Sequence, residues 1–206
     1  MGIENTIKKV KIKNLQKYIL KIEGPRHPID NLDKLNDVAN YILSEFEAYG
    51  LNTNEQRFDL SGVEGTFRNI EGYLGDGTQP ELIIISHYDT VAKSPGANDN
   101  ASAVALMLES ARILSQEKEN YNVRFISFTL EEGPPIFHNL EEANNLSYFT
   151  VGSNYWINRA MENKKDIKGI LCFDTIAYAN KNIAIENQTY KRFASYWNLS
   201  FFSVCS

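Results

Sequence analysis

Apolar residues recur at helical spacing in two segments of the first fifty residues. The shorter segment repeats them every three or four positions, at Leu15, Tyr18, Ile19 and Ile22. A longer repeat of the same kind runs from Leu32 to Tyr49. Asp30 or Asn31 precedes it as a candidate cap, and Gly50 follows it as a stop. This spacing places apolar side chains on one face, so both segments are predicted to be helices packed against a core.

Beyond Gly50 the pattern changes to short runs that are typical of strands. Residues 54–74 contain two of them, EQRFDL and FRNIEGYLG, which are separated by glycines and predict a hairpin. Three continuous apolar runs follow, over Leu82–Ile85, Val123–Leu130 and Gly169–Phe173. Continuous runs are typical of strands covered on both faces, so all three are predicted to be buried strands. Helical patterns lie between them, over Ala101–Leu114 and Ser153–Ala160.

The order of these elements predicts the fold class. Strands that alternate with helices favour an α/β domain, here a three-layer sandwich with a mixed, mainly parallel central sheet and helices on both faces. No repeat or low-complexity linker interrupts this order. Residues 1–206 are therefore expected to form a single domain.

Composition and charge narrow the possible functions. The 206 residues are enough for one substantial domain, and their net charge of -5 gives no broad basic surface for nucleic acid. The 2 cysteines cannot supply a disulfide framework or a thiolate zinc cluster, so any metal must be held by histidine and carboxylates. Lysines interrupt every apolar stretch in the first thirty residues, which predicts a cytoplasmic protein with no export signal and no membrane partner.

Residue types that bind metals follow each of the three buried runs. They are His87 and Asp89 after the first run, Glu131 and Glu132 after the second, and Asp174 after the third, with Asp99 in the intervening loop GANDNAS. The carboxyl ends of parallel strands meet at one edge of a sheet, so these side chains are expected to converge there. Five carboxylates around one histidine would repel one another strongly unless cations lay among them. The joint pattern therefore predicts a metal site.

Taken singly, each residue has an ordinary structural explanation. His87 and Asp89 are two positions apart, so the carboxylate can orient the imidazole, but a strand-end histidine can also hydrogen-bond a neighbour without any metal. Asp99 could cap the helix that follows it, and Asp174 could start a turn. None of these residues identifies a metal site alone.

The adjacent pair Glu131 and Glu132 allows a division of labour. One carboxylate can bind a cation while the other accepts a proton from an attacking water and returns it to a leaving amine. Alone, two neighbouring acids at a strand end could equally be solvated.

The combined motifs resemble those of the co-catalytic zinc aminopeptidases, peptidase family M28. The motifs are HYDT at 87–90, PGANDNAS at 95–102, EEG at 131–133 and the aspartate at 174. The resemblance extends from about Asn31 to Asp174 and implies the zinc-exopeptidase fold. It also implies a cis peptide bond after the bridging aspartate, between Asp99 and Asn100.

The resemblance further implies a role for each residue. Asp99 would bridge two zinc ions, His87 and Asp174 would complete the first site, and Glu132 would bind the second ion. Glu131 would be the general base. From its spacing to His87, Asp89 is expected to join Glu131 as a catalytic residue, by orienting the imidazole. The implied reaction is zinc-dependent hydrolysis of terminal peptide bonds in a peptide or amino-acyl substrate.

The chain departs from the family pattern in two places. Members carry a last histidine ligand far downstream, whereas this chain contains no histidine after His138 and ends at Ser206. We therefore expect one complete three-ligand zinc site and one incomplete site, in a domain that lacks its last strands and helix. His27 and His138 are the other candidate ligands. The stretch Gly133–Val151 is an apparent insertion, which could line a pocket or form a surface loop.

Two alternatives to the exopeptidase prediction remain. The chain could be a non-catalytic relative that retains the fold and at most one metal. It could also be a glutaminyl-cyclase-like acyltransferase, an activity known on this fold with a single zinc. The segment Arg26-His27-Pro28 precedes the long helix, and its residue types indicate no chemistry.

Overall fold

A five-stranded sheet forms the centre of the computed structural model, which describes residues 3–60, 63–76, 80–117, 122–132 and 150–177. The strand order is β1-β2-β4-β3-β5. The strands are β1 (Asn52–Asp59), β2 (Thr66–Leu74), β3 (Glu81–His87), β4 (Val123–Phe128) and β5 (Ile167–Cys172). Strands β1 and β2 form the predicted antiparallel hairpin, with Asn52 opposite Tyr73 and Asp59 opposite Thr66.

The sheet is mixed, as predicted. Strand β2 pairs antiparallel with β4, whereas β3 pairs parallel with both β4 and β5. The carboxyl ends of β3, β4 and β5 therefore lie at the same edge of the sheet, and this edge positions the candidate site.

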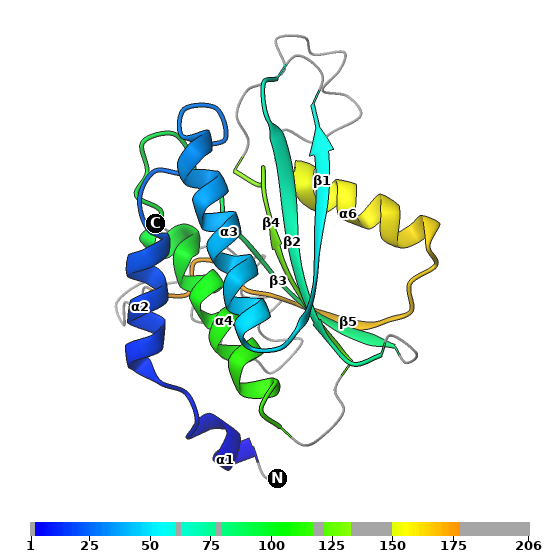
Figure 1. Ribbon diagram of the computed structural model, residues 1–206. Helices are drawn as coiled ribbons and strands as arrows, with labels where there is room; N and C mark the ends of the chain where they lie inside the picture. The colour runs from blue at the N-terminus through cyan, green and yellow to red at the C-terminus, as the bar shows by residue number, and fades with distance from the viewer. Residues whose placement is uncertain (1–2, 61–62, 77–79, 118–121, 133–149, 178–206) are drawn as a thin grey trace, which may run out of the picture.

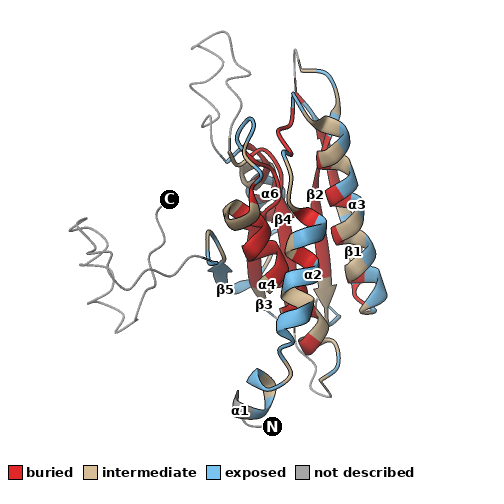
Figure 2. Ribbon diagram, turned by 90° about the vertical axis from the view of Figure 1, so that its left-hand side faces the viewer, coloured by how far each residue is buried: buried red, intermediate tan, exposed pale blue. Residues whose placement is uncertain are grey.

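Helices cover both faces of the sheet (Figure 1). The first layer contains α2 (Ile12–Ile22), α3 (Leu32–Ala48) and α4 (Ala103–Leu114), and the opposite face carries α6 (Val151–Glu162) (Figure 2). A short helix α1 (Ile3–Ile7) precedes the first layer, and an irregular, kinked turn η1 (Ala97–Ser102) leads into α4. This arrangement confirms the three-layer α/β prediction. No helix in the described ranges is long and apolar enough to cross a membrane.

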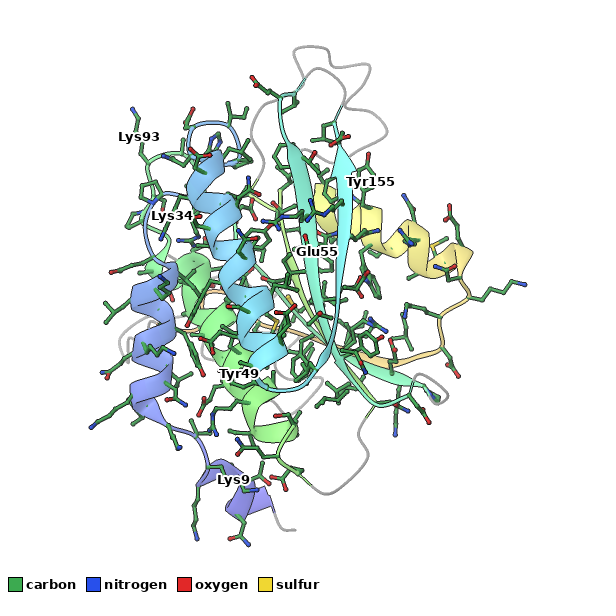
Figure 3. The ribbon with its side chains drawn as sticks, in the orientation of Figure 1. Lys9, Lys34, Tyr49, Glu55, Lys93 and Tyr155 are labelled. Carbon is green, nitrogen blue, oxygen red and sulfur yellow. The ribbon has the colours of Figure 1, made fainter. Side chains whose placement is uncertain are left out.

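Apolar faces of the helices meet the sheet in a continuous core. The α3 residues Val38, Ile42 and Phe46 are all buried, and Phe46 packs near Gly72 of β2. A Cβ atom at Gly72 would lie 2.6 Å from Phe46 Cγ, so glycine is needed for this close approach. On the other face, the ring of Tyr155 stacks on Phe58 of the hairpin with 4.2 Å between centroids (Figure 3). These contacts hold all three layers together.

Helix α3 begins at Leu32 and ends near Gly50, whose φ of 76° is the left-handed conformation that terminates helices. Asn31 occupies the cap position, but its side chain makes no capping hydrogen bond. The predicted helix boundaries are therefore confirmed, whereas the capping interaction is not formed.

The prediction that Gly169–Phe173 is buried is wrong. The segment does form a strand, but Ile170 is 55% exposed and its neighbour Leu171 is 47% exposed. Consecutive strand residues point to opposite faces, so β5 is open on both sides. Within the described residues β5 pairs only with β3 and lies at the edge of the sheet. An apolar run reports hydrophobicity and does not report a strand's place in the sheet order.

Candidate metal centre

The predicted site residues gather where the parallel strands end. His87 is the last residue of β3, and the pair Glu131 and Glu132 follows the end of β4. Asp174 follows β5, and Asp99 belongs to the irregular turn η1 before α4. The topology therefore brings together residues that are far apart in sequence.

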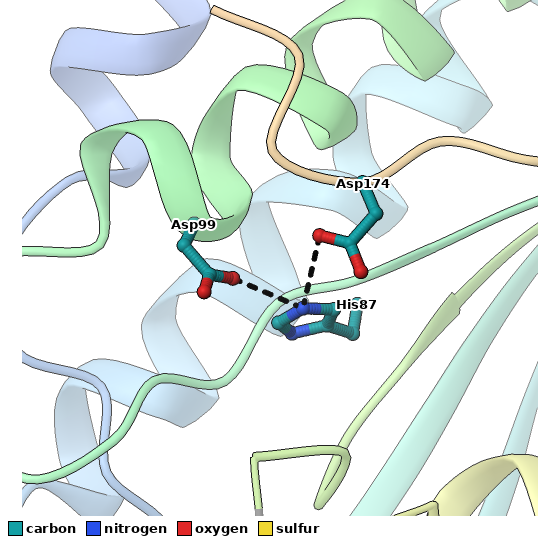
Figure 4. A group of neighbouring side chains, drawn as sticks. All are labelled: His87, Asp99 and Asp174. Carbon is teal, nitrogen blue, oxygen red and sulfur yellow. Dashed lines mark ion pairs between the residues drawn. The ribbon is translucent and has the colours of Figure 1, made fainter. Parts of the chain in front are cut away.

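The imidazole of His87 lies at the centre of this group and is only 6% exposed. Its Nε2 is 3.3 Å from Asp99 Oδ1, 3.6 Å from Glu132 Oε1 and 4.0 Å from Asp174 Oδ1. Figure 4 shows the carboxylates of Asp99 and Asp174 pointing toward the ring. Among the described residues, neither ring nitrogen has a hydrogen-bond partner. A buried polar atom without a partner is costly, which indicates that a ligand belongs there.

Asp89 lies beside the other ring nitrogen, as its spacing from His87 predicts. Its side chain is fully buried, and Oδ1 is 3.4 Å from His87 Nδ1. The second oxygen, Oδ2, accepts a hydrogen bond of 2.9 Å from the backbone N–H of Glu132. Asp89 therefore connects the histidine to the segment that carries the glutamate pair.

Asp99 is presented by an irregular turn rather than by a regular helix. Its φ and ψ are -107° and 95°, which are not helical, and the peptide bond to Asn100 is cis, as the resemblance implies. Residue Ser102 occupies the cap position of α4, and no side-chain capping bond is formed there. The alternative that Asp99 caps the helix is therefore wrong.

The side chain of Asn100 fixes the position of Asp174. Its Nδ2 donates to the carbonyl of Phe173 (3.3 Å), and its Oδ1 accepts from the backbone N–H of Thr175 (3.2 Å). Both neighbours of Asp174 are thus bound to the residue that follows Asp99. The sequence alone does not indicate this role, because an asparagine in a loop is also an ordinary turn former.

Glu131 is held by the first turn of α6. Its Oε1 accepts from the backbone N–H of Ser153 (2.8 Å), and its Oε2 accepts from the Ser153 hydroxyl (3.0 Å). Burial raises the pKa of Glu131 to about 7, against the lowering effect of these two bonds. A carboxyl group with such a pKa can both accept and return a proton at neutral pH.

The remaining acids also bind protons more readily than usual. Burial raises the pKa of Glu132, and the charge of Asp99 raises it further. Burial likewise raises the pKa of Asp174, although His87 opposes this shift. For His87 burial acts to lower the pKa, but Asp89 and Asp99 outweigh it and raise the pKa well above its ordinary value. Negative charge is therefore crowded around one imidazole.

The donor set fits a divalent cation of the zinc type. Ligand atoms of His87, Asp99 and Asp174 all lie within 4.8 Å of one another. One imidazole nitrogen with two carboxylates is a ligand combination that zinc accepts, and catalytic zinc sites commonly use three protein ligands. Glu132 stands beside this trio and is available to a second ion.

The two other histidines are placed differently. His27 accepts a hydrogen bond at Nδ1 from the backbone N–H of Asp30 (3.2 Å), at the start of the α3 region. His138 and nearly all of the insertion Gly133–Val151 lie outside the described residues. The predictions of a substitute ligand at His138 and of a pocket in the insertion therefore stay predictions.

The metal-free protein is expected to lose stability as the pH rises from 4.5 to about 7. The pKa of Glu131 is raised, so over this interval the folded chain keeps a proton that the unfolded chain has released. The free energy of unfolding then falls with pH, and the raised pKa values of Glu132 and Asp174 act in the same direction. The thermal midpoint of the chelator-treated protein, measured at about pH 5 and about pH 7, tests this loss of stability. Glu131→Gln should reduce the difference between the two midpoints. A higher thermal midpoint at about pH 7 than at about pH 5 would contradict the raised pKa of Glu131 in the folded chain.

Comparison with known proteins identifies relatives. Residues 69–200, more than half of the chain, match Peptidase family M28. The uncharacterized protein YfbL of Escherichia coli is 35% identical over 133 residues, which cover 61% of this chain and 40% of that protein. Aminopeptidase YwaD of Bacillus subtilis is 46% identical over 81 residues, which cover 39% of this chain and 16% of that protein. The chain thus spans less than half the length of either relative.

Solved structures show the same fold. A glutaminyl cyclase from Macrostomum lignano superposes with a TM-score of 0.72 over 84% of this chain and 55% of the cyclase. The sequence identity is 17%, so this likeness extends to the fold alone.

Proposed function

The chain belongs to peptidase family M28, and on this premise we propose that it is a zinc-dependent exopeptidase of the aminopeptidase type. The observation that carries the proposal is the buried Nε2 of His87, which faces the carboxylates of Asp99 and Asp174 and has no hydrogen-bond partner in the described part of the chain. The 46% identity to a protein named as an aminopeptidase supports hydrolysis at peptide ends.

Each residue has a role in the proposal. His87, Asp99 and Asp174 would hold one zinc ion, and Glu132 would hold a second ion together with Asp99. When bound, zinc supplies a Lewis acid that polarises a carbonyl group and lowers the pKa of water. Asp89 would keep the imidazole oriented through its contact at Nδ1.

Glu131 would act as the general base. Its carboxylate accepts a proton from the attacking water and then donates it to the amine that leaves. Ser153 limits the motion of this carboxylate, because both oxygens are bound to the same residue. The pKa of about 7 suits both halves of the transfer at neutral pH.

Ser153→Ala is expected to move the acid limb of the kcat/KM profile to higher pH. The substitution removes the hydroxyl donor at 3.0 Å and leaves the backbone N–H in place. Because the lost bond favours the ionised carboxylate, the pKa of Glu131 rises and activity near neutral pH falls by up to about tenfold. A suitable control is Ser44→Ala, since the exposed Ser44 hydroxyl donates to the Tyr41 carbonyl on α3. An acid limb that does not move would remove Ser153 from this role.

The proposed function is tested by giving two substrates, a leucyl amide and a peptide with an N-terminal glutamine, to one zinc-loaded preparation. Three outcomes can be distinguished. Release of leucine from a leucyl amide is the predicted result. Cyclisation of an N-terminal glutamine peptide without leucine release would favour the glutaminyl-cyclase alternative, which rests on a likeness of fold. Neither reaction in a folded, zinc-bound chain would favour the non-catalytic alternative.

A further inference from the structure

Arg26 is a buried cation that the proposed chemistry does not use. Its side chain is 0% exposed, although arginine is almost never fully buried without partners that satisfy it. It follows α2, in the segment Arg26-His27-Pro28 whose residue types indicate no chemistry. Its surroundings therefore require an explanation.

Backbone carbonyl groups satisfy the guanidinium. Nε, Nη1 and Nη2 all donate, over distances from 2.7 to 3.2 Å. The five acceptors are the carbonyl oxygens of Ile22, Gly24, Tyr88, Pro95 and Gly96. No carboxylate is among them, so Arg26 organises backbone segments rather than forming a simple ion pair.

These acceptors come from three segments that meet at Arg26, and two of the segments carry residues of the metal centre. Ile22 and Gly24 lie at the end of α2, which also packs against the irregular turn η1 (Ala97–Ser102). Tyr88 directly follows His87, and Gly96 lies shortly before Asp99. One rigid guanidinium thus fastens the His87 segment and the Asp99 segment to the same helix end.

The backbone at Gly96 leaves space for this contact. Gly96 has a φ of 57°, and a Cβ atom there would lie 2.5 Å from Arg26 Nη2. A second bond joins the same segments, since the backbone N–H of Arg26 donates to Thr90 Oγ1 (3.0 Å). The segments that carry Thr90 and Gly96 therefore both pack closely against Arg26.

The charge of Arg26 also suits this place. Burial lowers the pKa of Arg26 to about 10, while the charges of Asp89 and Asp99 oppose the change. The group therefore remains protonated at neutral pH. Its positive charge interacts favourably with Asp89 and Asp99, two of the crowded carboxylates.

We propose that Arg26 is a positioning residue of the metal centre, which holds the His87 and Asp99 segments at the spacing that a cation requires. The inference rests on the proposed function, because it takes the cluster to be a zinc site. Partners behind metal ligands typically contribute about 10- to 100-fold to metal affinity. We expect a loss of that size when the guanidinium is removed.

The experiment measures zinc affinity for Arg26→Lys by competition with a chromogenic chelator. Lysine keeps the positive charge but replaces the planar fork with a single ammonium group, which cannot reach both loops. Arg124→Lys is the matched control. Arg124 is also buried and binds Glu81 and Glu71 near the start of β4, at the opposite end of the strand from the site. Thermal midpoints with a chelator give the stability of each variant separately.

Zinc affinity should fall about 10- to 100-fold in Arg26→Lys and stay near the wild-type value in Arg124→Lys, even where both midpoints decrease. Wild-type affinity in Arg26→Lys, or equal losses in both variants, would overturn the positioning role and leave the proposed function intact. A wild-type chain that binds no zinc would overturn both.

If Arg26→Lys does not fold, a less disruptive substitution tests the same proposal. Thr90→Val keeps the shape of the side chain and removes the acceptor for the Arg26 backbone N–H. A several-fold loss of zinc affinity is expected, and wild-type affinity in Thr90→Val would overturn the proposal.

Discussion

Replacing His87 with alanine is expected to weaken zinc binding by more than about 100-fold, which exceeds the loss typical for a partner behind a ligand. The substitution removes the only nitrogen in the donor group of His87, Asp99 and Asp174. The two remaining carboxylates repel each other and hold no ion in a fixed geometry. Hydrolysis should be lost together with the metal, because the proposed reaction requires zinc.

His27→Ala provides the matched control for this prediction. Both histidines are buried, with 7% exposure for His27 and 6% for His87. His27 contacts Asp30 instead of the carboxylate cluster, so its loss should leave zinc affinity unchanged. Elemental analysis and chelator competition measure both variants. Unchanged zinc content in His87→Ala would refute the ligand assignment, and lost zinc in His27→Ala would make His27 a ligand.

Glu131→Gln is expected to lower kcat by about 10²- to 10⁴-fold, the contribution typical of a positioned general base. The amide keeps the size of the side chain but can neither accept the proton of the attacking water nor return it to the amine. Zinc affinity should stay close to wild type, because Glu131 is bound to Ser153 and is not a member of the donor group.

Separate readouts distinguish this outcome from a loss of folding or of metal. Zinc content and the thermal midpoint are measured in the same sample as leucyl amide hydrolysis. Glu64→Gln, at an exposed position before β2, should behave as wild type in all three measurements. Retained turnover in Glu131→Gln would exclude Glu131 as the base.

Much of the fold could be predicted because its signals are local. The spacing from Leu32 to Tyr49 predicts a helix that the structure places at Leu32–Ala48, and the run from Val123 is a fully buried strand. The gathering of His87, Glu132 and Asp174 could also be predicted. Parallel strands end at one edge of a sheet, so residues that directly follow them meet there whatever their distance in sequence.

The features that were missed depend on contacts between distant segments. Among the described residues, β5 lies at the edge of the sheet and both of its faces are exposed, and the apolar run reports neither feature. Arg26 binds backbone carbonyls, and because every residue type has one, no side-chain motif marks its partners. Asn100 binds the carbonyl of Phe173, 73 residues further along the chain, and no local sequence pattern indicates this contact.

Ser153 is an intermediate case. The sequence places Ser153 at the start of a predicted helix. An acidic partner can be expected there, because helix N-termini favour negative charge. That the partner is Glu131, across the insertion, required the structure. In each case residue type indicates the chemistry, and the tertiary fold selects the partner.

We have proposed that the cluster around His87 is a zinc centre at which peptide ends are hydrolysed. The most direct test is the zinc content of the purified, folded chain at zinc saturation, with leucyl amide hydrolysis measured in the same tube. We expect at least one bound zinc per chain, together with the release of leucine. A folded chain that binds no zinc under these conditions would contradict this proposal.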